Sequence, residues 1–254
     1  MQLSQQLVLV TGGARGLGKR IVKAFASQGA RVVINYHQSH QAAQQLVETH
    51  GPDRALAVQG DVTDPAQVTA IFKTAQHHFN APITTVVNNA LMDFSFNGDA
   101  RPHPTDIRWE HFEAQLAGSV RGALNTVQAA LPGMRDQAFG RIINIGTNLF
   151  QHPVVPYHDY TAAKAALLSL TRTLATDLGQ HQITVNMVSG GLLQTTDASA
   201  ATPDEVFDLI ASSTPLRKAT TPEEFADAIM FFASPWARAV TGQNLVVDGG
   251  LVMN

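Results

Sequence analysis

The alternation of apolar runs with helical patterns is the feature of this sequence that most restricts its fold. Strands that are apolar along their whole length are typical of a parallel sheet covered by helices on both faces. The sequence therefore predicts a three-layer α/β fold around a doubly wound parallel sheet. The runs rich in valine, isoleucine and leucine lie at 7–11, 31–36, 55–60, 84–89, 141–146, 183–189 and 244–248. The segments with helical periodicity lie at about 17–27, 39–50, 65–79, 108–135, 158–178, 203–212 and 222–233.

Length and composition exclude several classes of protein. A chain of 254 residues can bury one sizeable core and is short for two domains, so residues 1–254 are expected to form a single domain. The net charge of −3 gives no basic excess, so neither nucleic acid nor a membrane surface is expected as a partner. The absence of cysteine excludes disulfides and thiolate catalysis, and the ten histidines lack the spacing of a metal site. The N-terminal segment has no targeting pattern, so a cytoplasmic location is the default expectation.

A glycine-rich turn follows the first expected strand. Residues 11–18 have the sequence TGGARGLG and lead directly into a helical pattern. Glycines permit a tight turn, and the N-terminus of the following helix presents free N–H groups to a phosphate. An ordinary glycine-rich connection is the alternative, but the position between the first strand and a helix favours a dinucleotide site.

The end of the second strand favours NADP(H) over NAD(H). A site that prefers NAD usually carries an acidic residue about 20 residues after the glycine turn. Here Asn35, Tyr36 and His37 occupy that place, and no aspartate or glutamate occurs between the turn and position 48. Arg15, inside the turn, could hold a 2′-phosphate, although a solvated surface role is the alternative.

Tyr160 and Lys164 form a candidate acid–base pair. Residues four apart on a helix face the same way, and a neighbouring ammonium favours tyrosinate and lowers the pKa of the phenol. Such a phenol could exchange a proton with an alkoxide near neutral pH. Thr147 ends the preceding strand, and its hydroxyl could hold a carbonyl oxygen. A surface pair is the alternative, but the helix that follows the fifth strand lies on the same side of the sheet as the glycine turn.

These motifs together resemble the short-chain dehydrogenase/reductase family over essentially the full length of the chain. The closing segment TGQNLVVDGG is most similar to the bacterial 3-oxoacyl-[acyl-carrier-protein] reductases. The resemblance implies one Rossmann domain with strand order 3-2-1-4-5-6-7, a homotetramer, and hydride transfer between a nicotinamide and a carbonyl or secondary alcohol. The matching motifs are T-G-x-x-x-G-x-G at 11–18, Asp61-Val62, Asn88-Asn89-Ala90, Tyr160-x-x-x-Lys164 and Val185-Asn186.

The resemblance also implies roles for individual residues. Tyr160 becomes the general acid/base, Lys164 lowers its pKa and holds the nicotinamide ribose, and Thr147 replaces the usual serine. Asp61 would contact the adenine. The implied cofactor-binding residues are Gly12, Ala14, Arg15, Gly16, Leu17, Gly18, Asn35, Tyr36, His37, Asp61, Val62, Asn88, Asn89, Ala90, Tyr160, Lys164, Gly191 and Thr195.

The chain departs from the family pattern at three further places. Ser119 stands where an asparagine usually supports a water relay to the lysine, so it is expected to take part in catalysis. Leu91 replaces a glycine near the nicotinamide, and Gly190-Gly191 replaces Pro-Gly. These changes keep a non-catalytic, cofactor-binding sensor open as an alternative. The surviving tyrosine, lysine and hydroxyl favour an enzyme.

The expected substrate is a small-molecule carbonyl or an acyl thioester, reduced with NADPH to a secondary alcohol. Two loops, at about 91–107 and 190–215, are expected to border the substrate. Phe94 and Phe96 in the first loop either form an apolar substrate wall or pack the loop down. A carrier-protein substrate would require cations near the entrance. Gln137, Ala138 and His181 offer none that is permanent, but the nearby Arg135, Arg141 and Arg172 leave a basic rim open. A free ketone, a CoA thioester and a polyol therefore remain open.

Overall fold

The computed structural model describes residues 1–92, 94–194, 196, 199–200 and 202–253. Its centre is a sheet of seven strands in the order β3-β2-β1-β4-β5-β6-β7, and every neighbouring pair is parallel. The predicted fold class and strand order are therefore confirmed. The strands are β1 (Leu7–Val10), β2 (Arg31–Tyr36), β3 (Ala55–Gln59), β4 (Thr85–Asn88), β5 (Gly140–Thr147), β6 (Ile183–Gly190) and β7 (Asn244–Val247).

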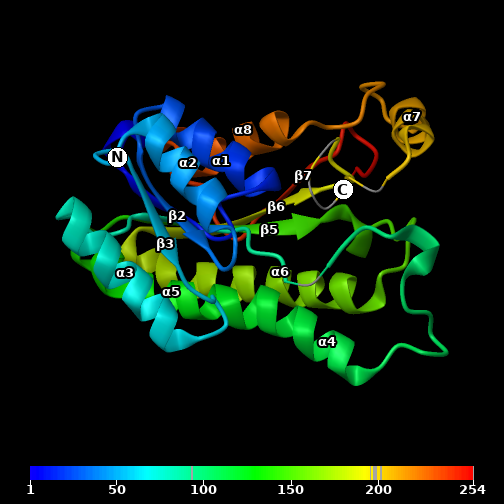
Figure 1. Ribbon diagram of the computed structural model, residues 1–254, viewed down its shortest axis with the longest axis horizontal. Coiled ribbons are helices and arrows are strands. Elements are labelled where there is room, and N and C mark those ends of the chain that lie inside the picture. Colours follow the sequence, from blue (N-terminus) through cyan, green and yellow to red (C-terminus); the bar gives the residue numbers. More distant parts are fainter. Residues whose placement is uncertain (93, 195, 197–198, 201, 254) are drawn as a thin grey trace.

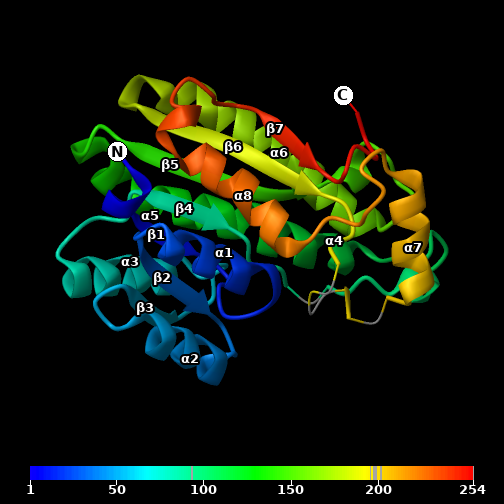
Figure 2. The same cartoon turned by 90° about the horizontal axis from the view of Figure 1, so that it is seen from above.

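Helices cover both faces of the sheet. Figure 1 shows α1, α2 and α8 on one face and α3, α4, α5 and α6 on the other, and Figure 2 shows the first group from above. Each face has its own apolar core because the strand side chains alternate between the two layers. The helices are α1 (Gly16–Ser27), α2 (His40–His50), α3 (Pro65–Phe79), α4 (Trp109–Leu116), α5 (Gly122–Asp136), α6 (His158–Leu178), α7 (Asp204–Ser213) and α8 (Pro222–Ala233).

Local capping explains where α3 begins. The Asp64 carboxylate accepts hydrogen bonds from the backbone N–H groups of Ala66 and Gln67, and Pro65 occupies the first helical position. The carboxylate satisfies donors that have no partner within the helix, and proline has no N–H to lose there. The predicted start of this helix is therefore confirmed.

The helix predicted over 108–135 is interrupted. It consists of α4, a π-helical segment η3 (Ala117–Arg121) and α5, and α5 continues past Pro132 to Asp136. Met134, in the last turn, is fully buried, so packing against the core holds the helix beyond the proline. Single π-helical turns redirect side chains locally, and this one places Ser119 toward the carboxyl edge of the sheet.

The carboxyl edge of the sheet brings the candidate site residues together. Strand β5 pairs with β4 only as far as Asn144, which lies opposite Asn88, and then continues for three residues to Thr147 beside Gly190 of β6. Thr147 therefore projects past the end of β4.

No helix in the described part of the chain is long and apolar enough to span a membrane.

Candidate functional site

The turn between β1 and α1 is built for close approach of backbone. Gly12 and Gly16 have φ angles of +60° and +49°, a region that side chains strongly disfavour. A Cβ atom at Gly18 would lie 2.2 Å from the Gly12 carbonyl oxygen and 2.7 Å from Asn89 Nδ2. The turn consequently keeps side chains away from the N-terminus of α1, and this bare cradle fits a phosphate group.

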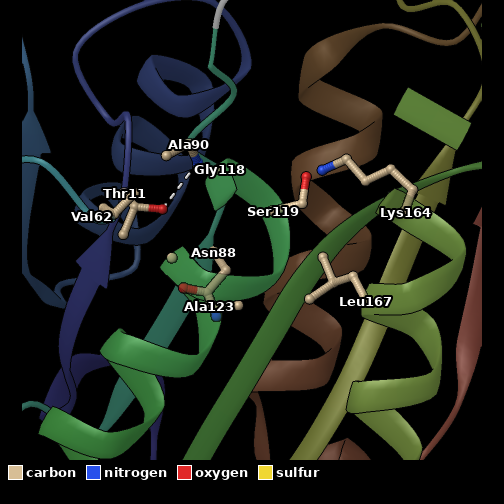
Figure 3. Close-up of a pocket in the computed structure, with 10 residues that line it drawn as sticks. Thr11, Val62, Asn88, Ala90, Gly118, Ser119, Ala123, Lys164 and Leu167 are labelled. Carbon is tan, nitrogen blue, oxygen red and sulfur yellow. Dashed lines mark hydrogen bonds between the residues drawn. The ribbon is translucent and has the colours of Figure 1, made fainter. Parts of the chain in front are cut away.

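Asn89 fastens this turn to the end of β4. Its backbone N–H donates to Thr11 Oγ1 at 2.9 Å, and its side-chain Nδ2 donates to the carbonyl oxygens of Thr11 and Gly12 at 2.9 and 3.2 Å. The Ala90 N–H also donates to Thr11 Oγ1, at 3.0 Å (Figure 3). The predicted cofactor residues after β1 and β4 therefore form one hydrogen-bonded unit.

The end of β2 carries polar groups and no carboxylate. The Asn35 side chain donates to the carbonyl oxygen of Gly60 at 2.9 Å, which ties β2 to the end of β3. The Tyr36 hydroxyl and His40 Nδ1 form a hydrogen bond of 2.7 Å, while His37 is exposed. Arg15 is exposed at the N-cap of α1.

Asp61 and Val62 follow β3. The Asp61 Oδ1 atom accepts hydrogen bonds of 2.8 Å from both the N–H and the Oγ1 of Thr63, so the carboxylate is held against the loop. The Val62 carbonyl oxygen accepts a bond of 2.9 Å from Asn125 Nδ2 on α5. The side chain of Val62 lines the same narrow cavity as Thr11.

This cavity connects the glycine turn with Lys164. It encloses about 10 Å³, roughly the room of one water molecule. In Figure 3 the Ser119 hydroxyl and Lys164 Nζ point toward one another across it. Thr11 and Lys164 therefore meet at the carboxyl edge of the sheet, although α1 and α6 cover opposite faces, so the prediction that α6 lies on the same side as the glycine turn is wrong. The lining residues are Thr11, Val62, Asn88, Ala90, Gly118, Ser119, Gly122, Ala123, Lys164 and Leu167.

Below the cavity lies a buried polar network that the sequence analysis did not identify. Asn88 Nδ2 donates to Asn144 Oδ1 at 2.8 Å, Thr126 Oγ1 donates to Asn88 Oδ1 at 2.7 Å, and Asn144 Nδ2 donates to Thr171 Oγ1 at 2.9 Å. All four side chains are buried. Asn144 inside the otherwise apolar segment IINIG is the sequence feature that could have predicted this network, because a buried amide requires partners.

Lys164 is anchored to strand β5. Its Nζ donates a hydrogen bond of 2.8 Å to the carbonyl oxygen of Ile145 and lies 5.7 Å from the centre of the Tyr160 ring. The side chain is buried, and burial lowers the pKa of its ammonium to about 8. The lysine therefore lies beside the Tyr160 ring and carries its proton less firmly than a surface lysine does.

The structure corrects the predicted pKa of Tyr160. The neighbouring lysine was expected to lower it, whereas burial raises the pKa of the phenol to about 12, opposed by a hydrogen bond with the Thr147 side chain. Tyr160 is only 5% exposed, so the cost of burying a phenolate dominates the shift. In this conformation the phenol keeps its proton.

The loop after β4 is the cause of this burial. The Phe94 ring stacks on the Tyr160 ring with centroids 4.2 Å apart and planes 15° apart, and Phe96 meets Tyr160 edge-on at 6.0 Å. Of the two roles left open for these phenylalanines, the structure shows the packing role. The Gly98 N–H donates to the Tyr157 hydroxyl at 2.8 Å and fastens the loop to the start of α6.

The segment after β6 is also tightly packed. A Cβ atom at Gly190 would lie 2.8 Å from the Phe225 ring, so packing against α8 requires the glycine that replaces the usual proline. Gly191 lies beside Asn148, whose Nδ2 donates to Asp248 Oδ2 at 2.9 Å. Thr195 lies outside the described residues.

Among the residues that are described, no cluster of histidine, aspartate and glutamate could hold a metal ion.

Comparisons with known proteins identify the family. A family model described as enoyl-(acyl carrier protein) reductase matches residues 12–252. A 3-oxoacyl-[acyl-carrier-protein] reductase of Synechocystis is 34% identical, with 99% of this chain and 98% of the relative covered. A 3alpha-hydroxysteroid dehydrogenase of Mediterraneibacter gnavus is 33% identical, with 98% of each chain covered. A solved Serratia marcescens short-chain dehydrogenase/reductase, a double mutant, is 31% identical with a TM-score of 0.85, and 99% of both chains is covered.

This chain belongs to the short-chain dehydrogenase/reductase family, as its motifs predicted. It is accordingly an oxidoreductase of a family that acts on carbonyl and alcohol groups with nicotinamide cofactors. The glycine cradle at the start of α1 fits a phosphate of a cofactor of this kind.

Proposed function

We propose that the protein reduces a carbonyl compound to a secondary alcohol with NADPH. The observation that supports this most strongly is the convergence of three groups: the Tyr160 phenol, hydrogen-bonded with Thr147, and the Lys164 ammonium in the cavity that begins at Thr11. A carbonyl carbon placed there would receive hydride from a bound nicotinamide. Its oxygen would be oriented by the Thr147 hydroxyl and would take the phenolic proton of Tyr160.

The raised pKa of Tyr160 suits the acid role that reduction requires. Reduction requires a protonated phenol as donor, and a phenol with a pKa of about 12 is protonated throughout the neutral range. Oxidation of an alcohol would require the phenolate, which burial disfavours. Lys164, positioned beside Ser119, would return a proton to the phenol after each turnover, which makes both residues part of the proposed catalytic machinery.

A panel of aldehydes, ketones and 3-oxoacyl thioesters tests this function. We expect NADPH oxidation with at least one carbonyl class and a loss of that activity in Tyr160→Phe. The second candidate is a cofactor-binding sensor without turnover, which the burial of Tyr160 beneath Phe94 favours. NADPH binding without oxidation by any member of the panel would support the sensor over the enzyme.

The preference for NADPH over NADH is supported by the end of β2. Tyr36 and His37 occupy the place where a carboxylate would repel a 2′-phosphate, and exposed Arg15 lies in the adjacent turn. We propose the predicted cofactor-binding residues as its contacts, including Thr195. Fluorescence titrations with both reduced cofactors test this preference, and tighter binding of NADH would overturn it.

The substrate is proposed more broadly than the 3-oxoacyl-[acyl-carrier-protein] of the Synechocystis relative. Ala138 is uncharged and exposed. Arg141 is buried, and its Nη1 donates to main-chain carbonyl oxygens. Neither residue is therefore suited to bind an acidic carrier protein. A 3-oxoacyl thioester or another small ketone remains the proposed class. A homotetramer and a cytoplasmic location stay predictions, which sedimentation and cell fractionation would test.

A further inference from the structure

Three aromatic side chains enclose one flat space beside the proposed proton donor, and Phe94 fills it. Its ring lies face to face with Tyr160 and edge-on to both Tyr157 and Phe96, at centroid distances of 5.2 and 5.1 Å. Leu149 and Val155 complete the same apolar cluster. Tyr160, Tyr157 and Phe96 thus border the space next to the phenol, and the Phe94 ring occupies it.

Phe94 covers one face of the Tyr160 ring and takes the space that a substrate would need beside the phenol. Tyr160 is 5% exposed, and its hydroxyl must come within hydrogen-bonding distance of a carbonyl oxygen before it can donate a proton. The Phe94 side chain belongs to an irregular, half-buried loop, in contrast to Tyr157 and Tyr160, which are buried at the start of α6. Phe94 is therefore the ring that has to leave.

We propose that Phe94 holds the place of the substrate's own ring, so that the preferred substrate is a ketone whose carbonyl is attached to a flat, apolar ring. This inference rests on the proposed function, because it places that ring beside the Tyr160 phenol. When Phe94 leaves, its stacked and edge-to-face ring contacts are lost, and a planar substituent restores such contacts with Tyr160, Tyr157 and Phe96. A puckered ring of equal size regains the apolar contact but loses the aromatic geometry.

Equilibrium binding of two unreactive amides tests the shape preference. Benzamide and cyclohexanecarboxamide carry the same carboxamide and rings of six carbons, of which only the first is flat. With the protein saturated with NADP⁺, we expect calorimetry to give a Kd about three- to tenfold lower for benzamide. Equal Kd values, or tighter binding of the cyclohexyl compound, would overturn the inference.

Variants of the loop test whether Phe94 competes with the ligand. In Phe94→Ala no ring has to be displaced, so both amides are expected to bind about tenfold more tightly while benzamide keeps its advantage. Phe96→Ala is the matched comparison, because it removes a wall of the same space and leaves Phe94 in place, so it should tighten neither amide and should weaken benzamide. Weaker binding in Phe94→Ala, or an equal gain in Phe96→Ala, would contradict the role assigned to Phe94. Phe94→Leu provides the same comparison with less change in apolar volume.

The amide experiment is independent of turnover and therefore separates two failures. If Tyr160→Phe lacks activity but the two amides bind the wild-type protein with equal Kd values, the proposed function stands and the ring preference is wrong. If Tyr160→Phe remains fully active while the amides follow the expected pattern, the acid assignment fails and the aromatic binding space stands.

Discussion

The Lys164 Nζ atom donates a hydrogen bond of 2.8 Å to the carbonyl oxygen of Ile145, two residues before Thr147 on the same strand. This bond joins α6 to the carboxyl end of β5, and it thereby holds Lys164 and Tyr160 at fixed positions relative to Thr147. The buried ammonium gains a partner that remains when no ligand is present, which limits the cost of its burial. Helix and strand together thus preorganise the proposed proton donor.

The Tyr160→Phe substitution tests the role of the phenol. It removes only the hydroxyl that would donate the proton, so kcat/KM is expected to fall by about 10²–10⁴, whereas the NADPH dissociation constant should change little. Stopped-flow NADPH oxidation and fluorescence titration measure the two quantities. Retention of wild-type kcat/KM would remove Tyr160 from the mechanism.

Lys164 predicts a pH dependence of stability. Its pKa in the folded protein, about 8, lies below the unfolded value of 10.5, so the unfolded chain binds more protons between these values. The free energy of unfolding should therefore gain a contribution on the order of 3 kcal/mol as pH rises from 8 toward 10.5, and lose it as pH falls again. Urea unfolding at intervals across this range measures the change.

The Lys164→Met variant isolates this contribution. Without the buried amine the pH-dependent gain disappears, and the variant should be at least as stable as the wild type at pH 7. Lys73→Met, at an exposed position on α3, is the matched control and should keep the wild-type pH dependence. Identical pH profiles for Lys164→Met and wild type would show that the amine is not desolvated.

Gly18→Ala tests the cradle at the start of α1. The added Cβ would lie 2.2 Å from the Gly12 carbonyl oxygen, so the turn has to shift. We expect a loss of about 1–3 kcal/mol in stability and at least about tenfold weaker cofactor binding. Gly179→Ala is the control, because a Cβ there meets no atom within 4 Å. Unchanged cofactor binding in Gly18→Ala would exclude the turn as the phosphate site.

Ser119 tests the proposed proton return to Lys164. Ser119→Ala removes the hydroxyl that points toward Nζ, and kcat should fall about five- to tenfold. Ser119→Asn restores a polar group of greater reach and should give a kcat equal to or above that of the wild type. A severe loss in the asparagine variant would indicate that Ser119 has a different role.

Local patterns predicted the fold and the candidate site residues. Apolar strands specified a covered parallel sheet, and Asp64 with Pro65 specified the start of α3. The spacing of Tyr160 and Lys164 specified one helix face. These features follow from sequence because each depends on residues within a few positions of one another, where side-chain periodicity and capping act.

Only the tertiary structure decided the pKa values of the site residues and which side chains bury them. The pKa of Tyr160 depends on burial by Phe94, a residue 66 positions earlier in the chain, and this burial reversed the expected direction. The bond from Asn88 to Asn144 and the break of the long helix at η3 likewise arise from segments distant in sequence. Desolvation and long-range packing are properties of neighbours in space, and the spacing of residues along one helix carries no information about them.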